Sequence, residues 1–153
     1  MNVSPDGIDF TQSFEGCSLT PYQDEAGVWT QGYGETGDDI GPDSPPWTQE
    51  EATEYFMQRA KAYEDAVNAD VTVPLEQYQF DALFDFAYNL GNSALAHSTL
   101  IQHINSGGDL TGLFELWDKV RENGELVVSA GLLRRRKAED ALFTSGDYGI
   151  TAP

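Results

Sequence analysis

The sequence predicts an α+β protein in which a small β-bearing lobe and a larger, mostly helical lobe are joined by one long helix. Residues 48–69 carry apolar side chains at helical spacing, residues 19–34 are short Tyr-, Val-, Trp- and Thr-bearing runs broken by glycines, and residues 77–91 are apolar on nearly every side. A chain of 153 residues can bury one core, so we expect a single domain. The expected parts are a β-bearing lobe at about 15–47, a linking helix at about 48–69 and a helical lobe at about 74–146, within one domain 1–153.

The first element is expected to be a short helix. Ser4 suits the N-cap position, Pro5 suits the first helical turn, and Gly16 is placed to end the helix. Residues 19–34 then predict a small β-hairpin or meander, and the polar, Pro- and Gly-rich residues 36–46 predict a surface loop.

The long helix has clear start signals. Thr48 can cap it, and Glu51 completes a capping box while its charge favours the positive end of the helix dipole. Its apolar face repeats over about five turns. The members of that face are Ala52, Tyr55, Phe56, Ala60, Tyr63, Ala66 and Val67.

The remaining chain is predicted to be helical. Pro74 marks a break after the long helix. Residues 77–91 then predict a buried central helix that ends at Gly91. We interpret the aromatic residues of this helix as core rather than as a cofactor site. Shorter helices are expected around residues 98–105, 111–121 and 132–143.

The chain carries a formal charge of −18, from 26 acidic and 8 basic residues. This excess argues against general nucleic-acid binding, for which a basic surface is expected. Two interpretations of the charge remain open: function in saline surroundings, where salt screens the repulsion, and maintenance of solubility.

No stretch reaches the roughly 18 to 20 apolar residues that a membrane span requires, and the N-terminal residues lack the basic and apolar regions of a signal peptide. We therefore expect no signal peptide, no transmembrane segment and no stable membrane association. Cys17 is the sole cysteine, so an internal disulfide cannot form.

Half of the basic residues stand in one run, which comprises Arg134, Arg135, Arg136 and Lys137. Such a run is commonly a solvated face of a helix. The alternative is a role in facing an anion or in pairing with carboxylates.

Glu15, Asp24 and Thr30 are the residues whose chemistry suggests a catalytic site. Glu15 lies at the expected helix end, Asp24 beside the expected hairpin turn, and Thr30 on the returning strand, so the turn can bring Asp24 and Thr30 together. Hydrolysis of a glycosidic bond needs one protonated carboxyl that assists the leaving oxygen and one carboxylate that activates water or stabilises positive charge. Among 26 acidic residues such a pair also arises by chance, so the spacing alone does not establish catalysis.

Two segments resemble the active-site segment of phage-type lysozymes, the endolysins of glycoside hydrolase family 24. They read FEG at 14–16 and YQDEAGVWTQGYG at 22–34, and the family pattern is Glu, eight residues, Asp, five residues, Thr. Glu15, Asp24 and Thr30 match this pattern without a gap. The likeness continues in QYQFDALFDFAYNLG, STL and GLLRRRKAEDALF, so it covers almost the whole chain in order and implies a lysozyme-like fold.

The resemblance implies hydrolysis of the β-1,4 linkage between N-acetylmuramic acid and N-acetylglucosamine in peptidoglycan, with no cofactor and no metal. By position, Glu15 would be the general acid. Asp24 would position or activate the attacking water, and Thr30 would hold that water.

The resemblance also assigns supporting residues. It places Arg135 near the catalytic glutamate and marks Tyr33 and Asn89 as candidates for the substrate cleft, with capping of a helix end as an equal alternative for Asn89. Where the family often reads GYGHT this chain reads GYGET, so Glu35 replaces a common histidine and any pairing of that histidine is lost or reversed.

The implied biology is that of an endolysin that stays in the host cytoplasm until lysis and then reaches the periplasm and cell wall. Its expected partners are peptidoglycan glycan strands and a separate pore-forming protein for release, with no nucleic-acid partner, and a monomer suffices. The alternative is a virion-associated lysozyme or a non-catalytic glycan-binding protein with the same fold.

Overall fold

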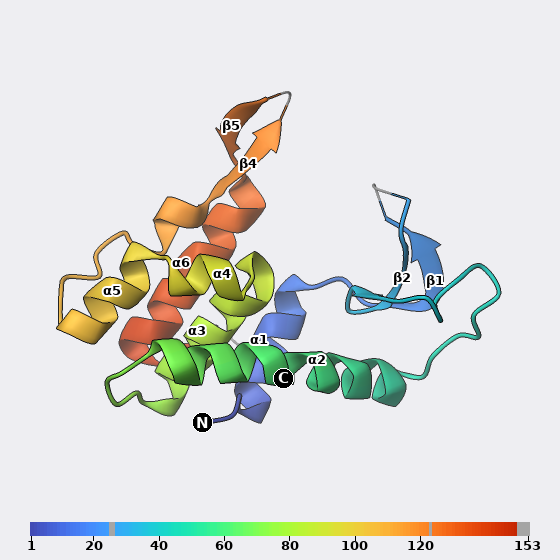
Figure 1. Ribbon diagram of the computed structural model, residues 1–153, viewed down its shortest axis with the longest axis horizontal. Coiled ribbons are helices and arrows are strands. Elements are labelled where there is room, and N and C mark those ends of the chain that lie inside the picture. Colours follow the sequence, from blue (N-terminus) through green and yellow to red (C-terminus); the bar gives the residue numbers. More distant parts are fainter. Residues whose placement is uncertain (25–26, 123, 150–153) are drawn as a thin grey trace. The chain divides into compact units, whose positions relative to one another are not determined.

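The computed structural model describes residues 1–24, 27–122 and 124–149 (Figure 1). The chain forms two compact units, the helical unit of Met1–Phe10 with Tyr63–Pro153 and the hairpin unit of Thr11–Ala62. None of the helices in the described part is long and apolar enough to cross a membrane. The predicted α+β class is confirmed.

Two helices contribute residues to both units, α1 (Pro5–Phe14) and α2 (Gln49–Asp70). Both begin with the predicted caps. The Ser4 hydroxyl accepts a hydrogen bond of 3.0 Å from the Gly7 backbone N–H. Thr48 and Glu51 form the predicted reciprocal box, in which each backbone N–H donates to the side chain of the other, at 2.7 and 3.1 Å.

The hairpin unit contains a three-stranded antiparallel meander, which confirms the predicted β structure. Its strands are β1 (Ser18–Gln23), β2 (Trp29–Gly32) and β3 (Glu35–Thr36), in the order β1-β2-β3. On the first pair of strands, Tyr22 lies opposite Thr30.

The helical unit is built around α3 (Gln77–Leu90), the predicted buried helix, which packs against α6 (Ala130–Ser145). Two shorter helices, α4 (Asn92–Ala96) and α5 (Thr99–Ser106), follow α3 in the chain. Aromatic and aliphatic side chains fill the core, and each fully buried one contributes about 1.5–3 kcal/mol. The core includes Phe80, Leu83, Phe84, Phe86, Leu95, Leu100, Phe114 and Leu142.

The predicted helix at 111–121 is wrong. Only a single 3₁₀ turn, η1 (Glu115–Trp117), forms there, and it is followed by an antiparallel pair of strands, β4 (Lys119–Glu122) and β5 (Glu125–Val128). Alternation of charged residues with β-branched valines favours strands, and Gly124 adopts the left-handed φ of +89° that the turn requires. We call this pair the β4–β5 ribbon; it extends away from the helices of its unit (Figure 1).

Candidate active site

Glu15 directly follows α1, at the position that the sequence predicts. Its backbone N–H donates to the Gln12 carbonyl oxygen at 3.2 Å, which completes the last helical turn. The side chain is half-buried. Glu15 therefore lies between the end of α1 and β1, which begins at Ser18.

Asp24 closes the turn between β1 and β2. Its backbone N–H donates to the Val28 carbonyl oxygen and its carbonyl accepts from the Gly27 N–H, both at 2.9 Å. Its Oδ1 atom also accepts from the Val28 N–H at 2.9 Å, while the side chain stays exposed. One carboxylate oxygen is thus held by the turn, and the carboxylate remains in contact with solvent.

Thr30 lies on β2, near the turn that Asp24 closes. Thr30 is opposite Tyr22, two residues before Asp24, and its hydroxyl donates to the Val28 carbonyl oxygen at 3.1 Å. Since opposed residues share a face of an antiparallel pair and Asp24 directly follows β1, Asp24 and Thr30 both lie at the turn end of the hairpin. The register thus supports the predicted approach of these two residues.

Glu35 holds the turn between β2 and β3. It is 8% exposed, and its Oε2 atom accepts from the Tyr33 backbone N–H at 2.6 Å. At Gly32, where φ is +65°, an added Cβ would lie 2.5 Å from the same oxygen, so this turn requires glycine.

A cation accompanies Glu35. The Arg59 Nη1 atom lies 3.9 Å from the Glu35 Oε1 atom and donates to the Gly34 carbonyl oxygen at 3.0 Å. Burial raises the pKa of Glu35; its backbone hydrogen bonds and Arg59 oppose that rise, and the negative charge of Glu15 adds to it. Glu15 and Glu35 are therefore close enough to interact electrostatically within the hairpin unit.

Tyr33 belongs to the core of the hairpin unit. Its ring packs edge-on against Phe56 with centroids 5.6 Å apart, and its hydroxyl accepts from the Gln49 side chain at 2.8 Å. Burial raises the pKa of this hydroxyl. Its predicted contact with substrate stays a prediction.

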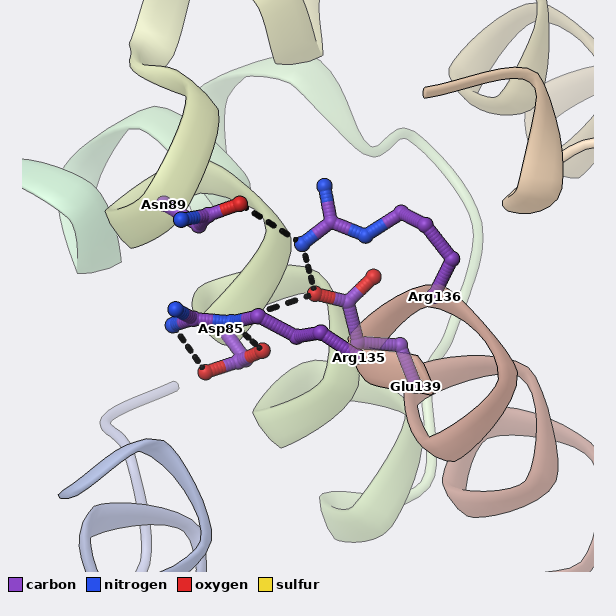
Figure 2. Close-up of polar contacts among 5 residues, drawn as sticks. All are labelled: Asp85, Asn89, Arg135, Arg136 and Glu139. Atoms are coloured by element: carbon purple, nitrogen blue, oxygen red, sulfur yellow. Dashed lines mark hydrogen bonds and ion pairs between the residues drawn. The ribbon is translucent and has the colours of Figure 1, made fainter. Parts of the chain in front are cut away.

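Arg135 and Asn89, the other two predicted site residues, lie in the helical unit (Figure 2). Arg135 donates to both carboxylate oxygens of Asp85, from Nε at 2.9 Å and from Nη2 at 2.8 Å. Asn89 accepts from Arg136 at 2.9 Å, which gives its amide a partner on α6. The approach of Arg135 to Glu15 stays a prediction.

Arg136 and Glu139 complete this buried cluster, with 2.6 Å between Nη2 and Oε1. Arg135 is 4% exposed, and Arg136, Glu139 and Asp85 are not exposed at all. Burial and the neighbouring Asp85 raise the pKa of Glu139 well above its ordinary value, against the effect of the two arginines. The solvated-face interpretation of the basic run thus fails for Arg135 and Arg136, which pair with carboxylates.

The sequence interpretation missed three residues that hold these arrangements: Arg59, Asp85 and Glu139. Helical spacing offered a partial signal, since Glu139 follows Arg135 by four residues. Asp85 lies in an apolar helix, where a charge requires a partner. Among the residues that the structure describes, no group of three or more His, Cys, Asp or Glu side chains is arranged to hold a metal ion.

Comparisons with known proteins show the family of this chain. The family described as Phage lysozyme matches residues 12–139. The endolysin of Acyrthosiphon pisum secondary endosymbiont phage 1 is 37% identical over 153 residues, which cover 95% of this chain and 99% of the relative.

Solved structures give the same result. The endolysin from Escherichia coli O157:H7 phage FAHEc1 has a TM-score of 0.85 at 35% identity, over 97% of this chain and 96% of that one. The muramidase domain of SpmX from Asticaccaulis excentricus has a TM-score of 0.86 at 32% identity, over 94% and 98%. The chain therefore belongs to the phage lysozyme family of glycoside hydrolases, which act on peptidoglycan.

Proposed function

We propose that this protein cleaves the β-1,4 bond between N-acetylmuramic acid and N-acetylglucosamine, with Glu15 as general acid and Asp24 and Thr30 at the attacking water. The observation that carries the proposal is the register of β1 and β2, in which Thr30 lies opposite Tyr22, two residues before Asp24, near the turn end of the hairpin. Glu15 lies in the same unit, three residues before β1 begins.

The hydrogen bonds of the hairpin suit these roles. The Thr30 hydroxyl donates its proton to the Val28 carbonyl, so its oxygen lone pairs are available to accept a proton of the water. The exposed Asp24 carboxylate accepts from the Val28 N–H through Oδ1, and as a carboxylate it can also accept the second water proton. A water held in this way directs a lone pair at the anomeric carbon, while Glu15 protonates the departing glycosidic oxygen.

Attack by water on the face opposite the leaving group inverts the anomeric centre. The reaction then produces a new reducing end on N-acetylmuramic acid. Borohydride reduction of the products followed by sugar analysis identifies that end, and it separates a muramidase from an enzyme that cuts at N-acetylglucosamine.

The test compares hydrolysis of purified peptidoglycan by the wild type with that by Glu15→Gln, which keeps the size of the side chain and removes the acid. We expect the rate to fall by roughly 10²- to 10⁴-fold, with the melting temperature unchanged. A Glu15→Gln protein that still clears peptidoglycan at the wild-type rate would disprove the role of Glu15. A folded wild type that binds peptidoglycan without cleaving it would instead favour a non-catalytic glycan-binding protein.

The biological role that we propose is that of an endolysin released from the host cytoplasm by a separate pore-forming partner. Its support is the likeness to named endolysins. Expression of this chain in a bacterial host should leave the cells intact until a pore-forming protein is co-expressed. Lysis by this chain alone would contradict the need for that partner.

A further inference from the structure

The net charge of −18 raises the question of how this chain binds an anionic substrate. Of its 8 basic residues, Arg135 and Arg136 are buried against Asp85 and Glu139, so the basic run does not present four cations to the wall. Two further cations, Lys119 and Arg121, lie on the β4–β5 ribbon, and both are exposed.

The register of the ribbon gathers these cations with two exposed apolar side chains. Lys119 lies opposite Val128, and Arg121 lies opposite Leu126. Opposed residues of an antiparallel pair share a face, so all four side chains project from one side of the ribbon. Leu126 is 62% exposed and Val128 is 56% exposed.

The opposite face of the ribbon differs. Val120 and Val127, which are also paired with each other, are only half-exposed. The Arg121 Nη1 atom donates to the Gly124 carbonyl oxygen at 2.7 Å, which holds the guanidinium beside the turn and leaves other N–H groups for a ligand. The exposed face therefore has two cations, of which Arg121 is held beside the turn, and two aliphatic side chains.

We propose that this face of the β4–β5 ribbon binds the peptide stems of peptidoglycan, with Lys119 and Arg121 contacting stem carboxylates and Leu126 and Val128 packing against the alanine methyl groups. Neighbouring side chains on one face of a strand are about 7 Å apart, which matches alternate residues of an extended peptide. The inference rests on the proposed action on peptidoglycan and adds the part of that polymer that the ribbon contacts.

A peptide stem fits this face better than a lipid surface does. Membrane attachment through an amphipathic surface requires a large apolar area together with several cations. The ribbon offers two aliphatic side chains and two cations, on a chain whose total charge of −18 would be repelled by anionic lipid. A short carboxylate-bearing peptide needs only local charge complementarity.

The test measures kcat and KM on intact peptidoglycan and on the same glycan after an amidase has removed its stems. The variant Lys119→Gln/Arg121→Gln is compared with Arg134→Gln/Lys137→Gln, which removes the same charge from two exposed positions on α6. At low salt we expect the ribbon variant to raise KM on intact peptidoglycan roughly three- to tenfold above the control, with kcat unchanged. The two variants should be equal on stripped glycan.

Two further variants separate recognition from folding of the ribbon. Lys119→Arg/Arg121→Lys keeps both charges and should retain the wild-type KM. Leu126→Ser/Val128→Ser should raise KM on intact peptidoglycan alone. Equal KM values for the ribbon variant and the α6 control on intact peptidoglycan would overturn the inference, as would a difference that persists on stripped glycan.

A binding experiment makes the result independent of hydrolysis. A soluble stem peptide is titrated into ¹⁵N-labelled Glu15→Gln protein, and the backbone amide signals of Lys119, Arg121, Leu126 and Val128 should shift together and saturate. Shifts with anionic lipid vesicles and none with the peptide would assign the face to a membrane and overturn the inference. If the wild type cleaves neither glycan while the peptide binds, the proposed function fails and the ribbon site stands.

Discussion

The two units of this protein use carboxylates in opposite ways. In the hairpin unit, Glu15 is half-buried and Asp24 is exposed, and Asp24 is held by one backbone N–H of its own turn. In the helical unit, Asp85 and Glu139 are wholly buried and paired with arginines. The first arrangement keeps Glu15 and Asp24 at least partly exposed to solvent, whereas the second fixes α3 and α6 to each other.

The two sites differ in the hydrogen-bond donor that would lose its partner if the carboxylate were removed. Loss of the Asp24 side chain releases the N–H of the exposed residue Val28, which water can satisfy. Loss of Asp85 leaves the guanidinium of Arg135 buried without its main anion, which is far more costly. Sequence composition does not distinguish these cases, because all four residues are ordinary members of a set of 26 acids.

The largest expected effect comes from exchanging Asp85. We expect Asp85→Ala to lower the free energy of unfolding by about 3–5 kcal/mol, because it removes the two hydrogen bonds that Arg135 donates to Asp85 and takes a carboxylate away from a buried guanidinium. Urea unfolding monitored by circular dichroism measures the change.

The matched variant in the hairpin unit is Asp24→Asn, whose amide oxygen can still accept from the Val28 N–H. Its free energy of unfolding should change by less than about 1 kcal/mol, while hydrolysis of peptidoglycan is lost. If Asp24→Asn and Asp85→Ala destabilised the fold equally, the contrast between the two units would be wrong.

A smaller effect is expected from the titration of Glu139, which should make the free energy of unfolding depend on pH. Its pKa in the folded protein is raised above the ordinary 4.5 by burial and by Asp85, so the folded state holds this proton more tightly than the unfolded state. The corresponding stability is present below pH 4.5 and is lost as the pH rises through the folded pKa, by at most about 1.4 kcal/mol per pH unit.

Glu139→Gln removes this titration and keeps an oxygen that can accept from Arg136. The difference in unfolding free energy between wild type and Glu139→Gln should therefore change with pH above 4.5, with the wild type losing more stability as the pH rises. Thermal unfolding at a series of pH values measures this difference. A difference that is constant with pH would show that Glu139 does not titrate in that range.

The sequence predicts the elements of the fold that depend on local signals. The caps at Ser4 and Thr48, the long helix and the buried central helix all follow from periodicity and capping residues. The sequence does not predict the β4–β5 ribbon because Phe114 and Trp117 continue a helix-like apolar spacing to within two residues of β4.

For the candidate site residues, too, the sequence predicts local groupings but not contacts between distant parts of the chain. Glu15, Asp24 and Thr30 share a short segment, so pattern and turn chemistry suffice to group them. The partners of Arg135 and Glu35 are separated from them by 50 and 24 positions, at Asp85 and Arg59. Such pairings depend on how helices pack, which no local pattern encodes.

A modest effect is expected from Arg59. Its side chain is 39% exposed, so the ion pair with Glu35 is screened by solvent and contributes less than about 1 kcal/mol. Arg59→Met should lower the free energy of unfolding by no more than that amount and should raise the pKa of Glu35 further. Carboxyl NMR titration of Glu35 measures the shift, and a lowered pKa would contradict the stabilising role of the cation.

The smallest expected effect is that of salt on lytic activity. Salt screens exposed carboxylates, whereas it should have little influence on buried ones. Raising the ionic strength from about 0.01 M to about 0.15 M shortens the Debye length from about 30 Å to about 8 Å. Repulsion between the −18 chain and an anionic wall should then weaken, so the initial rate of turbidity loss should rise by a few-fold over this range. A neutral soluble glycan serves as the control, because its hydrolysis should not respond.

The ribbon cations act in the opposite direction, since salt also weakens the attraction of Lys119 and Arg121 for carboxylates. Eighteen net negative charges outweigh two local positive ones at long range, so the rise should dominate at low salt. The buried pairs Asp85–Arg135 and Glu139–Arg136 are shielded from salt by burial, so the stability that they give should change little. A rate that falls steadily from the lowest salt would show that local attraction, rather than the charge of the whole chain, governs the approach to the wall.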